Sequence, residues 1–223
     1  MHIRWYGQSA FLLTGEQQRV FIDPFGDLSG LKERGMEWGY PPIDGIEADL
    51  LLVTHDHLDH NEVDVIGGDP VVIRVAGTHD SPVGEVVGIA SEHDDAAGTQ
   101  RGPNTVFRFT LDGLRVAHFG DFGQPALRPE QRAALGVVDV LILPVGGGPT
   151  IAAADAAQLV REVAPRLVVP MHFRTDLIGF LDPPDAFLDA LGADVERLPA
   201  NELVVEEQLG PELRVALLSP PPA

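Results

Sequence analysis

The segment 54–60 carries the residues best suited to bind a metal ion, in the pattern H-x-H-x-D-H. It directly follows the apolar run Leu-Leu-Leu-Val, which is typical of a buried strand, so the cluster lies where the chain leaves a sheet. His55 and His57 are two residues apart, so in an extended segment their rings point to the same side and can share one ion. Asp59 and His60 lie further round the turn, in position for a second ion. Imidazole nitrogen and carboxylate oxygen are ordinary Zn²⁺ ligands, and this spacing predicts a metal site rather than a solvated polar turn.

Further polar residues follow other expected strands. His93, Asp121 and His172 each come at the end of an apolar segment, and His93 is a candidate ligand. Asp23 ends an earlier strand, where it either orients a ligand histidine or serves as a simple turn residue. His118 lies within a strand on its apolar face, which favours a packed or supporting histidine over a ligand.

Composition limits what this cluster can do. The chain has 223 residues with 44% hydrophobic content, which suits one domain spanning 1–223 around a single core. Its 34 acidic and 15 basic residues give a net charge of −19, so we expect neither nucleic acid nor an anionic membrane as the main partner. There is no cysteine, so any metal must be held by histidine and carboxylate. The N-terminus lacks signal-peptide features and no apolar stretch is long enough to span a bilayer, so we expect a soluble cytoplasmic protein.

A long loop is expected over residues 25–45, which are rich in glycine and proline. Long loops in compact domains are commonly functional lids. Trp38 and Tyr40 in this loop could form an apolar wall at the mouth of the site, and packing on the sheet edge is the alternative. Arg174 follows the last polar strand end closely enough to contact a substrate, although a solvated surface arginine is the alternative.

The remaining pattern predicts strands in the first part of the chain and alternating helices and strands in the second. We expect strands at 2–6, 10–14, 19–23, 50–53, 71–75, 85–90, 105–111, 114–119, 138–143, 167–170, 202–206 and 213–218. We expect helices at 62–66, 129–135, 152–164 and 183–191. His79 is expected in a turn. The Gly146–Gly148 run lacks the Lys-Ser/Thr ending of a nucleotide loop, so we expect it to let the backbone pass close to the metal site, with Thr150 capping the next helix.

Together these motifs resemble the metallo-β-lactamase superfamily of metal-dependent hydrolases. The resemblance covers nearly the whole chain, and it rests on the H-x-H-x-D-H loop, Tyr6-Gly7-Gln8-Ser9, Ile22-Asp23-Pro24, Gly120-Asp121 and Pro170-Met171-His172. Within the superfamily, the chain is similar to the branch of L-ascorbate 6-phosphate lactonase and the N-acyl-phosphatidylethanolamine phospholipase D type. The resemblance implies an α/β (α+β) fold, a four-layer αββα sandwich in which two sheets pack face to face between outer helices.

The resemblance also implies a division of the ligands between two divalent ions. The first ion would be held by His55, His57 and His93, the second by Asp59, His60 and His172, with Asp121 bridging both. Zn²⁺ is preferred, and Mn²⁺ or Fe²⁺ would also suit these ligands. A metal-bridging hydroxide would then attack the substrate without a protein nucleophile. The general acid is open between Asp59, a metal-bound water and, less favoured, His118.

We therefore expect a binuclear hydrolase acting on a small anionic ester, either a phosphodiester or a lactone. A large polyanion would be repelled by the acidic surface, whereas a small anion can be held by the ions. A homo-oligomer is compatible with the sequence. The alternatives are a di-iron redox module of the same fold, a non-catalytic metal-binding interaction module, and a nuclease. The redox module is disfavoured because His57 stands where such proteins have glutamate, and the nuclease is disfavoured by the charge.

Overall fold

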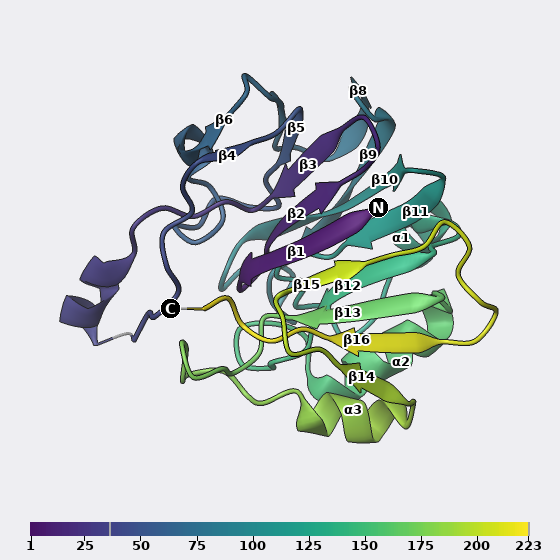
Figure 1. The fold of residues 1–223 in the computed structure, drawn as a ribbon. Helices are drawn as coiled ribbons and strands as arrows, with labels where there is room; N and C mark the ends of the chain where they lie inside the picture. The colour runs from purple at the N-terminus through teal and green to yellow at the C-terminus, as the bar shows by residue number, and fades with distance from the viewer. Residues whose placement is uncertain (36, 223) are drawn as a thin grey trace.

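Two β-sheets form the body of the protein, and a computed structural model describes residues 1–35 and 37–222 (Figure 1). The first sheet has the strand order β15-β1-β2-β3-β5-β7. Its strands are β1 His2–Gly7, β2 Ala10–Thr14, β3 Arg19–Ile22, β5 Leu50–Leu52, β7 Val71–Ile73 and β15 Glu202–Val204. The second sheet has the order β14-β16-β13-β12-β11-β10-β9-β8. Its strands are β8 Gly77–Ser81, β9 Gly84–Glu92, β10 Pro103–Leu111, β11 Leu114–His118, β12 Val140–Pro144, β13 Leu167–Met171, β14 Val195–Arg197 and β16 Arg214–Leu217.

Helices and short pieces complete the structure. The α-helices of the described residues are α1 Pro129–Leu135, α2 Ala153–Val163 and α3 Asp185–Leu191. Two 3₁₀ helices lie at Ser29–Arg34 and Val63–Val65, and β4 Ile46–Glu47 pairs with β6 Ile66–Gly67. Within the described residues, no helix has the length and apolar character that a bilayer crossing requires.

Alternation along the strands of the first sheet assigns each face to a different core. Leu50 and Leu52 of β5 pack into the large core between the sheets, whereas Leu51 packs into a second cluster on the outer face. The same alternation places Ile22 inside and Phe21 outside in β3, because successive strand residues point to opposite faces. Both faces of this sheet are therefore buried.

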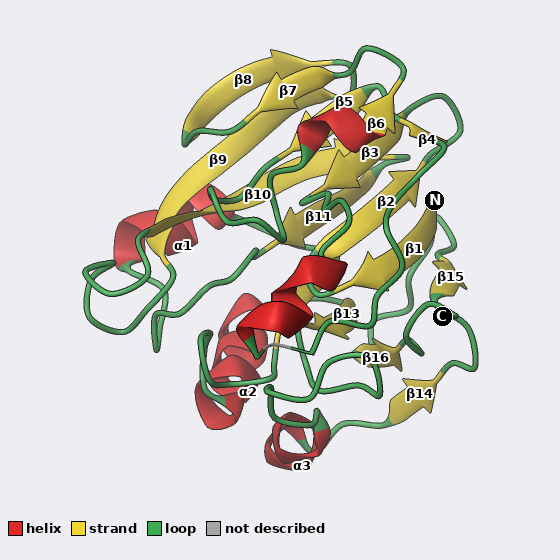
Figure 2. Cartoon of the chain, turned by 90° about the vertical axis from the view of Figure 1, so that its left-hand side faces the viewer, coloured by secondary structure: helices red, strands yellow, loops and turns green. Residues whose placement is uncertain are grey.

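The second sheet is covered by the α-helices. The strands β12 and β13 are buried at every position, as expected for parallel strands covered on both faces. Apolar residues of α2 and α3 join the same core as these strands. Figures 1 and 2 show both helices on the side of this sheet that faces away from the first sheet. The expected α/β sandwich is thus confirmed.

The outer face of the first sheet is not covered by the helices that were expected there. Loop segments cover it instead, through side chains such as Phe25, Ile43, Ile178 and Leu181. Figure 2 shows short 3₁₀ helices, the β4–β6 pair and loops on this side of the described chain. Apolar side chains spaced along loops can seal a sheet face without forming a helical repeat.

Parallel strand directions gather the strand ends at one edge. β11, β12 and β13 run parallel, and β9 runs parallel to β11 because each is antiparallel to β10. In the first sheet β3 and β5 are parallel, so the chain leaves β5 at one end of that sheet. This edge is where ligands collect in layered α/β proteins.

Several local expectations are corrected by the structure. His79 lies in the edge strand β8, paired with Val86, rather than in a turn. β14 was not expected, and the helix expected at 62–66 is only a 3₁₀ turn. Ala152, not Thr150, is the N-cap residue of α2, and the Thr150 hydroxyl donates to the carbonyl of Gly147. These segments are polar or short, so apolar periodicity does not reveal them.

Candidate metal centre

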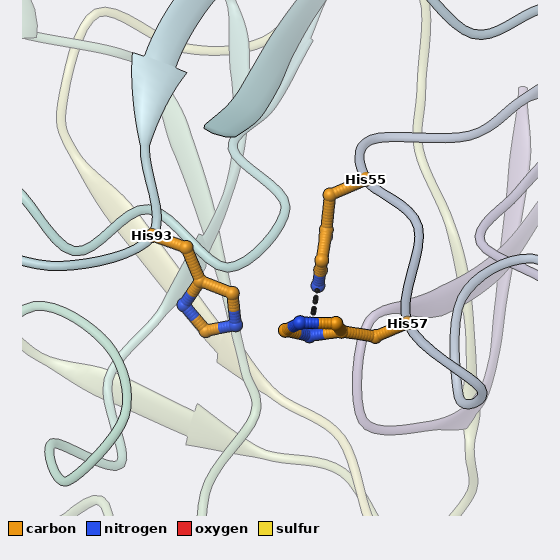
Figure 3. Close-up of side chains that lie close together, drawn as sticks. All are labelled: His55, His57 and His93. Atoms are coloured by element: carbon orange, nitrogen blue, oxygen red, sulfur yellow. Dashed lines mark hydrogen bonds between the residues drawn. The ribbon is translucent and has the colours of Figure 1, made fainter. Parts of the chain in front are cut away.

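Three histidines from two strand ends converge in the first part of the site. His55 and His57 follow β5, and His93 follows β9. One ring nitrogen from each lies within 4.8 Å of the others, and the three rings turn toward a common point (Figure 3). The His55 Nε2 and His57 Nδ1 atoms are 2.9 Å apart. This group is the one that the resemblance assigns to a first ion.

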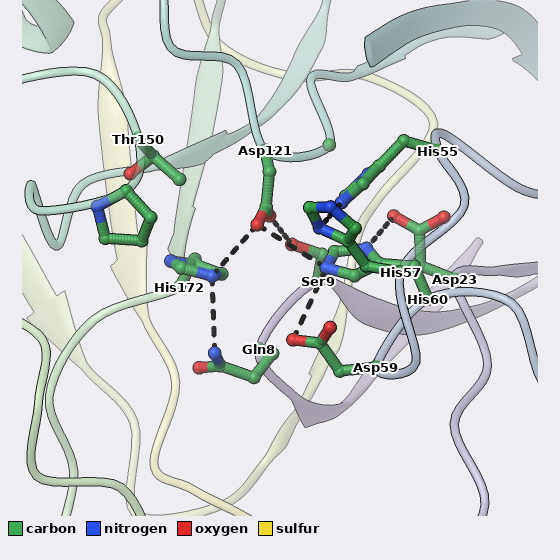
Figure 4. Close-up of polar contacts among 12 residues, drawn as sticks. Gln8, Ser9, Asp23, His55, His57, Asp59, His60, Asp121, Thr150 and His172 are labelled. Atoms are coloured by element: carbon green, nitrogen blue, oxygen red, sulfur yellow. Dashed lines mark hydrogen bonds and ion pairs between the residues drawn. The ribbon is translucent and has the colours of Figure 1, made fainter. Parts of the chain in front are cut away.

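Asp121 lies at the centre of the whole cluster. Its Oδ2 atom is 3.3 Å from His93 Nε2, 3.5 Å from His60 Nε2 and 3.2 Å from His172 Nε2 (Figure 4). A second group of potential ligand atoms, also within 4.8 Å, comprises His55, His60 and Asp121. One carboxylate oxygen therefore faces both groups of histidines.

Asp59 lies at the margin of this cluster. Its Oδ2 atom is 3.6 Å from His60 Nε2, and its side chain keeps 27% of its surface exposed. Burial raises the pKa of Asp59, but the neighbouring His60 outweighs it and the net pKa is lowered. The carboxylate form suits a metal ligand better than a proton donor.

Hydrogen bonds fix which nitrogen each histidine turns inward. Thr54 Oγ1 donates to Asp23 Oδ2 at 2.7 Å and so accepts from His55 Nδ1 at 3.0 Å. His60 Nδ1 lies 3.0 Å from Asp23 Oδ2, and His93 Nδ1 lies 3.1 Å from a backbone carbonyl. With Nδ1 donating, Nε2 is left as the free lone pair in all three rings, the usual way in which proteins orient metal-binding imidazoles.

Asp121 is oriented in a similar way. Ser9 donates its hydroxyl to Asp121 Oδ1 at 2.8 Å, which leaves Oδ2 facing the histidines. The backbone N–H of Asp121 donates to Asn104 Oδ1, and the Asn104 amide donates in turn to Phe119 O and Ser91 Oγ. Each of these partners is buried, so the position of the carboxylate is well determined.

The electrostatics of the cluster favour a positive charge among its carboxylates. Burial lowers the pKa of His60, but the carboxylates of Asp121, Asp59 and Asp23 outweigh it and raise this pKa well above its usual value. Burial raises the pKa of Asp121, but His172 and His60 hold it well below its usual range. His55 is different, since burial and the positive field of His60 lower its pKa. The pKa values of the adjacent His55 and His60 are thus shifted in opposite directions. This arrangement suits one positive ion bound by both histidines better than a separate proton on each.

The residues present fit a metal. His60 is fully buried, and its Nε2 atom has no hydrogen-bond partner among the described residues, although it faces two carboxylates. A buried polar atom without a partner is costly, and a cation between Nε2 and the carboxylates would satisfy it. Nitrogen and oxygen donors without sulfur suit Zn²⁺, Mn²⁺ or Fe²⁺.

Backbone geometry at the site is unusual. His172 has φ 50° and Asp23 has φ 52°, in the left-handed region that residues with a Cβ rarely adopt. Gly146 donates its backbone N–H to His172 O, and a Cβ there would collide with that carbonyl. The glycine run does pass close to the site, as expected. Left-handed conformations of this kind cluster at functional sites.

The structure places the other candidate residues away from the ligand atoms. His118 is fully buried, its Nε2 donates to Ser9 O and its Nδ1 accepts from Gly120 N, so neither nitrogen is free to act as the general acid. Burial lowers the pKa of His118 to about 4. Arg174 is exposed, and its Nε donates to the carbonyl of Leu181 rather than facing the cluster.

Trp38 and Tyr40, the two aromatic candidates of the 25–45 loop, lie in different surroundings. Tyr40 is 3% exposed, packs against Trp5, and pairs its hydroxyl with Thr175 Oγ1 at 3.1 Å, so it belongs to the core and the expectation of a wall residue is wrong for it. Trp38 instead lines a cavity of about 250 Å³ that reaches His57 and Asp59. The remaining lining residues are Leu31, Glu37, Leu58 and Phe180.

Sequence reasoning missed the part of the site that comes from the β1–β2 turn. Gln8 and Ser9 form this turn, and both are fully buried. Ser9 reaches Asp121, and Gln8 Nε2 lies 3.2 Å from His172 Nε2. Two polar residues between two apolar strands read as an ordinary surface hairpin, and only the docking of the sheets shows that this hairpin is internal.

Known proteins are similar to this chain in fold and in sequence. A model of the β-lactamase superfamily domain matches residues 2–172. A UPF0173 metal-dependent hydrolase of Thermococcus kodakarensis is 30% identical, with 78% of this chain and 84% of that protein covered. Another of Archaeoglobus fulgidus is 30% identical, with 88% and 94% covered. A Thermotoga maritima structure assigned to the Zn-dependent hydrolases of the metallo-β-lactamase superfamily has a TM-score of 0.79 at 29% identity, with 98% of both chains covered.

The chain therefore belongs to the metallo-β-lactamase superfamily. Within it, the chain groups with the UPF0173 metal-dependent hydrolases. The family expected from the motifs is confirmed, while the narrower likeness to the lactonase and phospholipase D branch stays a prediction.

Proposed function

We propose that this chain is a binuclear metal-dependent hydrolase that cleaves a small anionic ester, either a phosphodiester or a lactone. The observation that carries the proposal is the position of Asp121, whose Oδ2 lies 3.3 Å from His93 on one side and within 3.5 Å of His60 and His172 on the other. A carboxylate oxygen shared between two groups of histidines suits two ions about 3.5–4 Å apart. Zn²⁺ is the preferred metal, with Mn²⁺ or Fe²⁺ as alternatives.

Each side chain then has a task. His55, His57 and His93 would hold one ion, and the second would be held by Asp59, His60 and His172, with Asp121 between them. Two ions there would lower the pKa of a water molecule and polarise the bond under attack. Asp23, Thr54 and Ser9 hold the donor atoms in the required orientation through the hydrogen bonds described above. No nucleophile from the protein is needed for hydrolysis.

The surroundings support a substrate of limited size. The cavity of about 250 Å³ beside His57 and Asp59 has mostly apolar walls, so it suits an apolar portion of the substrate next to the scissile bond. An anionic group would be held by the ions, since the net charge of −19 repels large polyanions elsewhere on the surface. We propose that the substrate is a small molecule rather than a nucleic acid.

The test combines metal analysis with a hydrolysis screen. Protein purified without chelator should contain close to two divalent ions per chain, and it should hydrolyse a phosphodiester or a lactone faster than a thioester. Chelation should abolish the activity, and added Zn²⁺ or Mn²⁺ should restore it. The control is His79→Ala, which removes a histidine of the edge strand outside the cluster. It should keep the metal content and the activity of the wild type. Reconstituted protein with no metal, or with metal but no ester hydrolysis, would show that the proposal is wrong.

A further inference from the structure

Gln8 is buried beside His172, within the cluster of candidate metal ligands, and its backbone conformation is one that glutamine rarely adopts. It has φ 45° and no exposed surface. Its carbonyl accepts the indole N–H of Trp5 at 2.9 Å, which fixes the turn, and it follows Gly7, where a Cβ would collide with the Tyr40 ring. A left-handed conformation in a buried turn is retained when the surrounding structure imposes it, and such positions cluster at active sites.

The amide of Gln8 is incompletely paired. Figure 4 shows its nitrogen directed at His172. The two Nε2 atoms are 3.2 Å apart, and the buried Oε1 atom of Gln8 has no partner within the part of the chain that the structure describes. If His172 Nε2 holds a metal, its lone pair is occupied and cannot accept from Gln8 as well. Both ends of the amide then need partners from within the site.

Gln131 shows what a structural glutamine looks like in the same molecule. It is 2% exposed, and its Nε2 donates to Ala90 O and Gln124 Oε1, while its Oε1 accepts from Arg128 N. Every hydrogen-bonding atom of that amide is satisfied. A buried amide without such partners, aimed at ligand atoms, points to a partner that arrives with the substrate.

We infer that the Gln8 amide N–H donates to the substrate oxygen on which negative charge develops during hydrolysis, which makes Gln8 a catalytic residue. The inference rests on the proposed function. The amide keeps both its protons and forms no bond to the substrate, so it acts only by stabilising charge. A donor already held in place in a water-poor site is effective because it needs no reorganisation.

The competing role for Gln8 is to position His172. That role acts through the metal ligand, so losing the amide would alter metal binding. A charge-stabilising role leaves the metal unchanged and alters the binding of oxyanions and the chemical step. The two roles are separated by measuring the metal and the anion independently of turnover.

The experiment compares Gln8→Met, which has similar length and no amide, with the control Gln131→Met. Metal content, the visible spectrum of the Co²⁺-substituted protein, the dissociation constant of inorganic phosphate for the metal-loaded protein, and kcat and KM on bis(p-nitrophenyl) phosphate are measured for each. We expect Gln8→Met to keep the metal content and Co²⁺ spectrum of the wild type. Its kcat should fall about 100-fold with little change in KM, as for loss of one oxyanion donor. Phosphate should bind about tenfold more weakly. Gln131→Met should match the wild type in phosphate binding and kcat.

Other outcomes overturn the inference. Unchanged phosphate binding and kcat in Gln8→Met would exclude a contact with the anion, and a changed Co²⁺ spectrum with parallel loss of metal would assign Gln8 to positioning. If wild type with its metals hydrolyses no ester, the proposed function fails, and phosphate binding alone then decides the role of Gln8. If Gln8→Met does not fold, Gln8→Asn replaces it, because asparagine tolerates the left-handed backbone. Its shorter amide should also lower kcat, and a rate equal to wild type would overturn the inference.

Discussion

At the scale of single residues, Asp23 shows how much of a metal site is decided by groups that need not touch the metal. Its Oδ1 accepts the backbone N–H of Thr54 at 2.8 Å, and its Oδ2 accepts from the Thr54 hydroxyl and from His60 Nδ1. The sequence left its role open between a turn residue and an orienting carboxylate. The structure shows that it does both, since its left-handed backbone ends β3 while its side chain holds His60 directly and His55 through Thr54.

We expect Asp23→Asn to weaken binding of the proposed second ion about 10-fold to 100-fold, because the amide is a poorer acceptor for His60 Nδ1–H and lowers the basicity of Nε2. Asparagine tolerates the left-handed backbone, so the turn should survive. Competition with a chelator of known affinity measures the effect. Asp49→Asn is the control, because Asp49 accepts the backbone N–H of Arg19 in the same sheet and lies outside the cluster. Equal losses in both variants would contradict an orienting role for Asp23.

At the scale of elements, the sequence predicted most strands and all three α-helices of the described residues, because their apolar residues recur with the period of the element. It could not predict β8, whose residues Thr78, His79 and Asp80 are polar on an exposed edge. It also could not place the β1–β2 turn in the site. The contacts of Gln8 with His172 and of Ser9 with Asp121 join residues 164 and 112 positions apart, and no local pattern encodes such pairs.

The loop 25–45 gives a prediction that separates its two aromatic residues. Trp38→Ala should change the relative rates on esters with different apolar groups, because Trp38 lines the cavity beside His57, while metal content stays constant. Tyr40→Ala should instead lower the free energy of unfolding by about 3–5 kcal/mol, because it leaves a cavity in a packed core. Denaturant unfolding and a panel of esters measure the two effects. If Trp38→Ala kept the wild-type ratio of rates on the different esters, the loop would have only a structural role.

At the scale of the whole molecule, His118 couples the docking of the two sheets to pH. It belongs to β11 of the second sheet, but it contacts the first sheet. Its ring packs edge to face against the Phe11 ring, with the ring centroids 5.7 Å apart, and its Nε2 donates to Ser9 O. Burial lowers its pKa from 6.5 to about 4, with Asp23, His60 and Asp121 as the nearest charged groups. The folded protein therefore holds this histidine neutral, whereas the unfolded chain protonates it below pH 6.5.

Stability contributed by the neutral His118 is present above the unfolded pKa and is lost as the pH falls from about 6.5 to about 4. The full shift corresponds to about 3 kcal/mol. In chelator, the free energy of unfolding of the wild type should fall over this interval by about that much more than that of His118→Gln. Glutamine keeps a donor for Ser9 O and does not titrate, and the other titrating groups are common to both proteins. Parallel pH profiles would show that His118 is not protonated on unfolding.

The pairing of β1 with β15 has a consequence for how the chain is made. Ile3 is opposite Leu203, which follows it by 200 positions, and β15 covers the outer edge of the first sheet. During synthesis, β1 leaves the ribosome long before β15 exists, so the side of β1 that does not pair with β2 stays open until residues 202–204 have been translated. An open strand edge invites pairing with other chains, and contacts so distant in sequence form slowly. The nascent protein should therefore depend on protection from aggregation until residues 202–204 emerge and close the sheet.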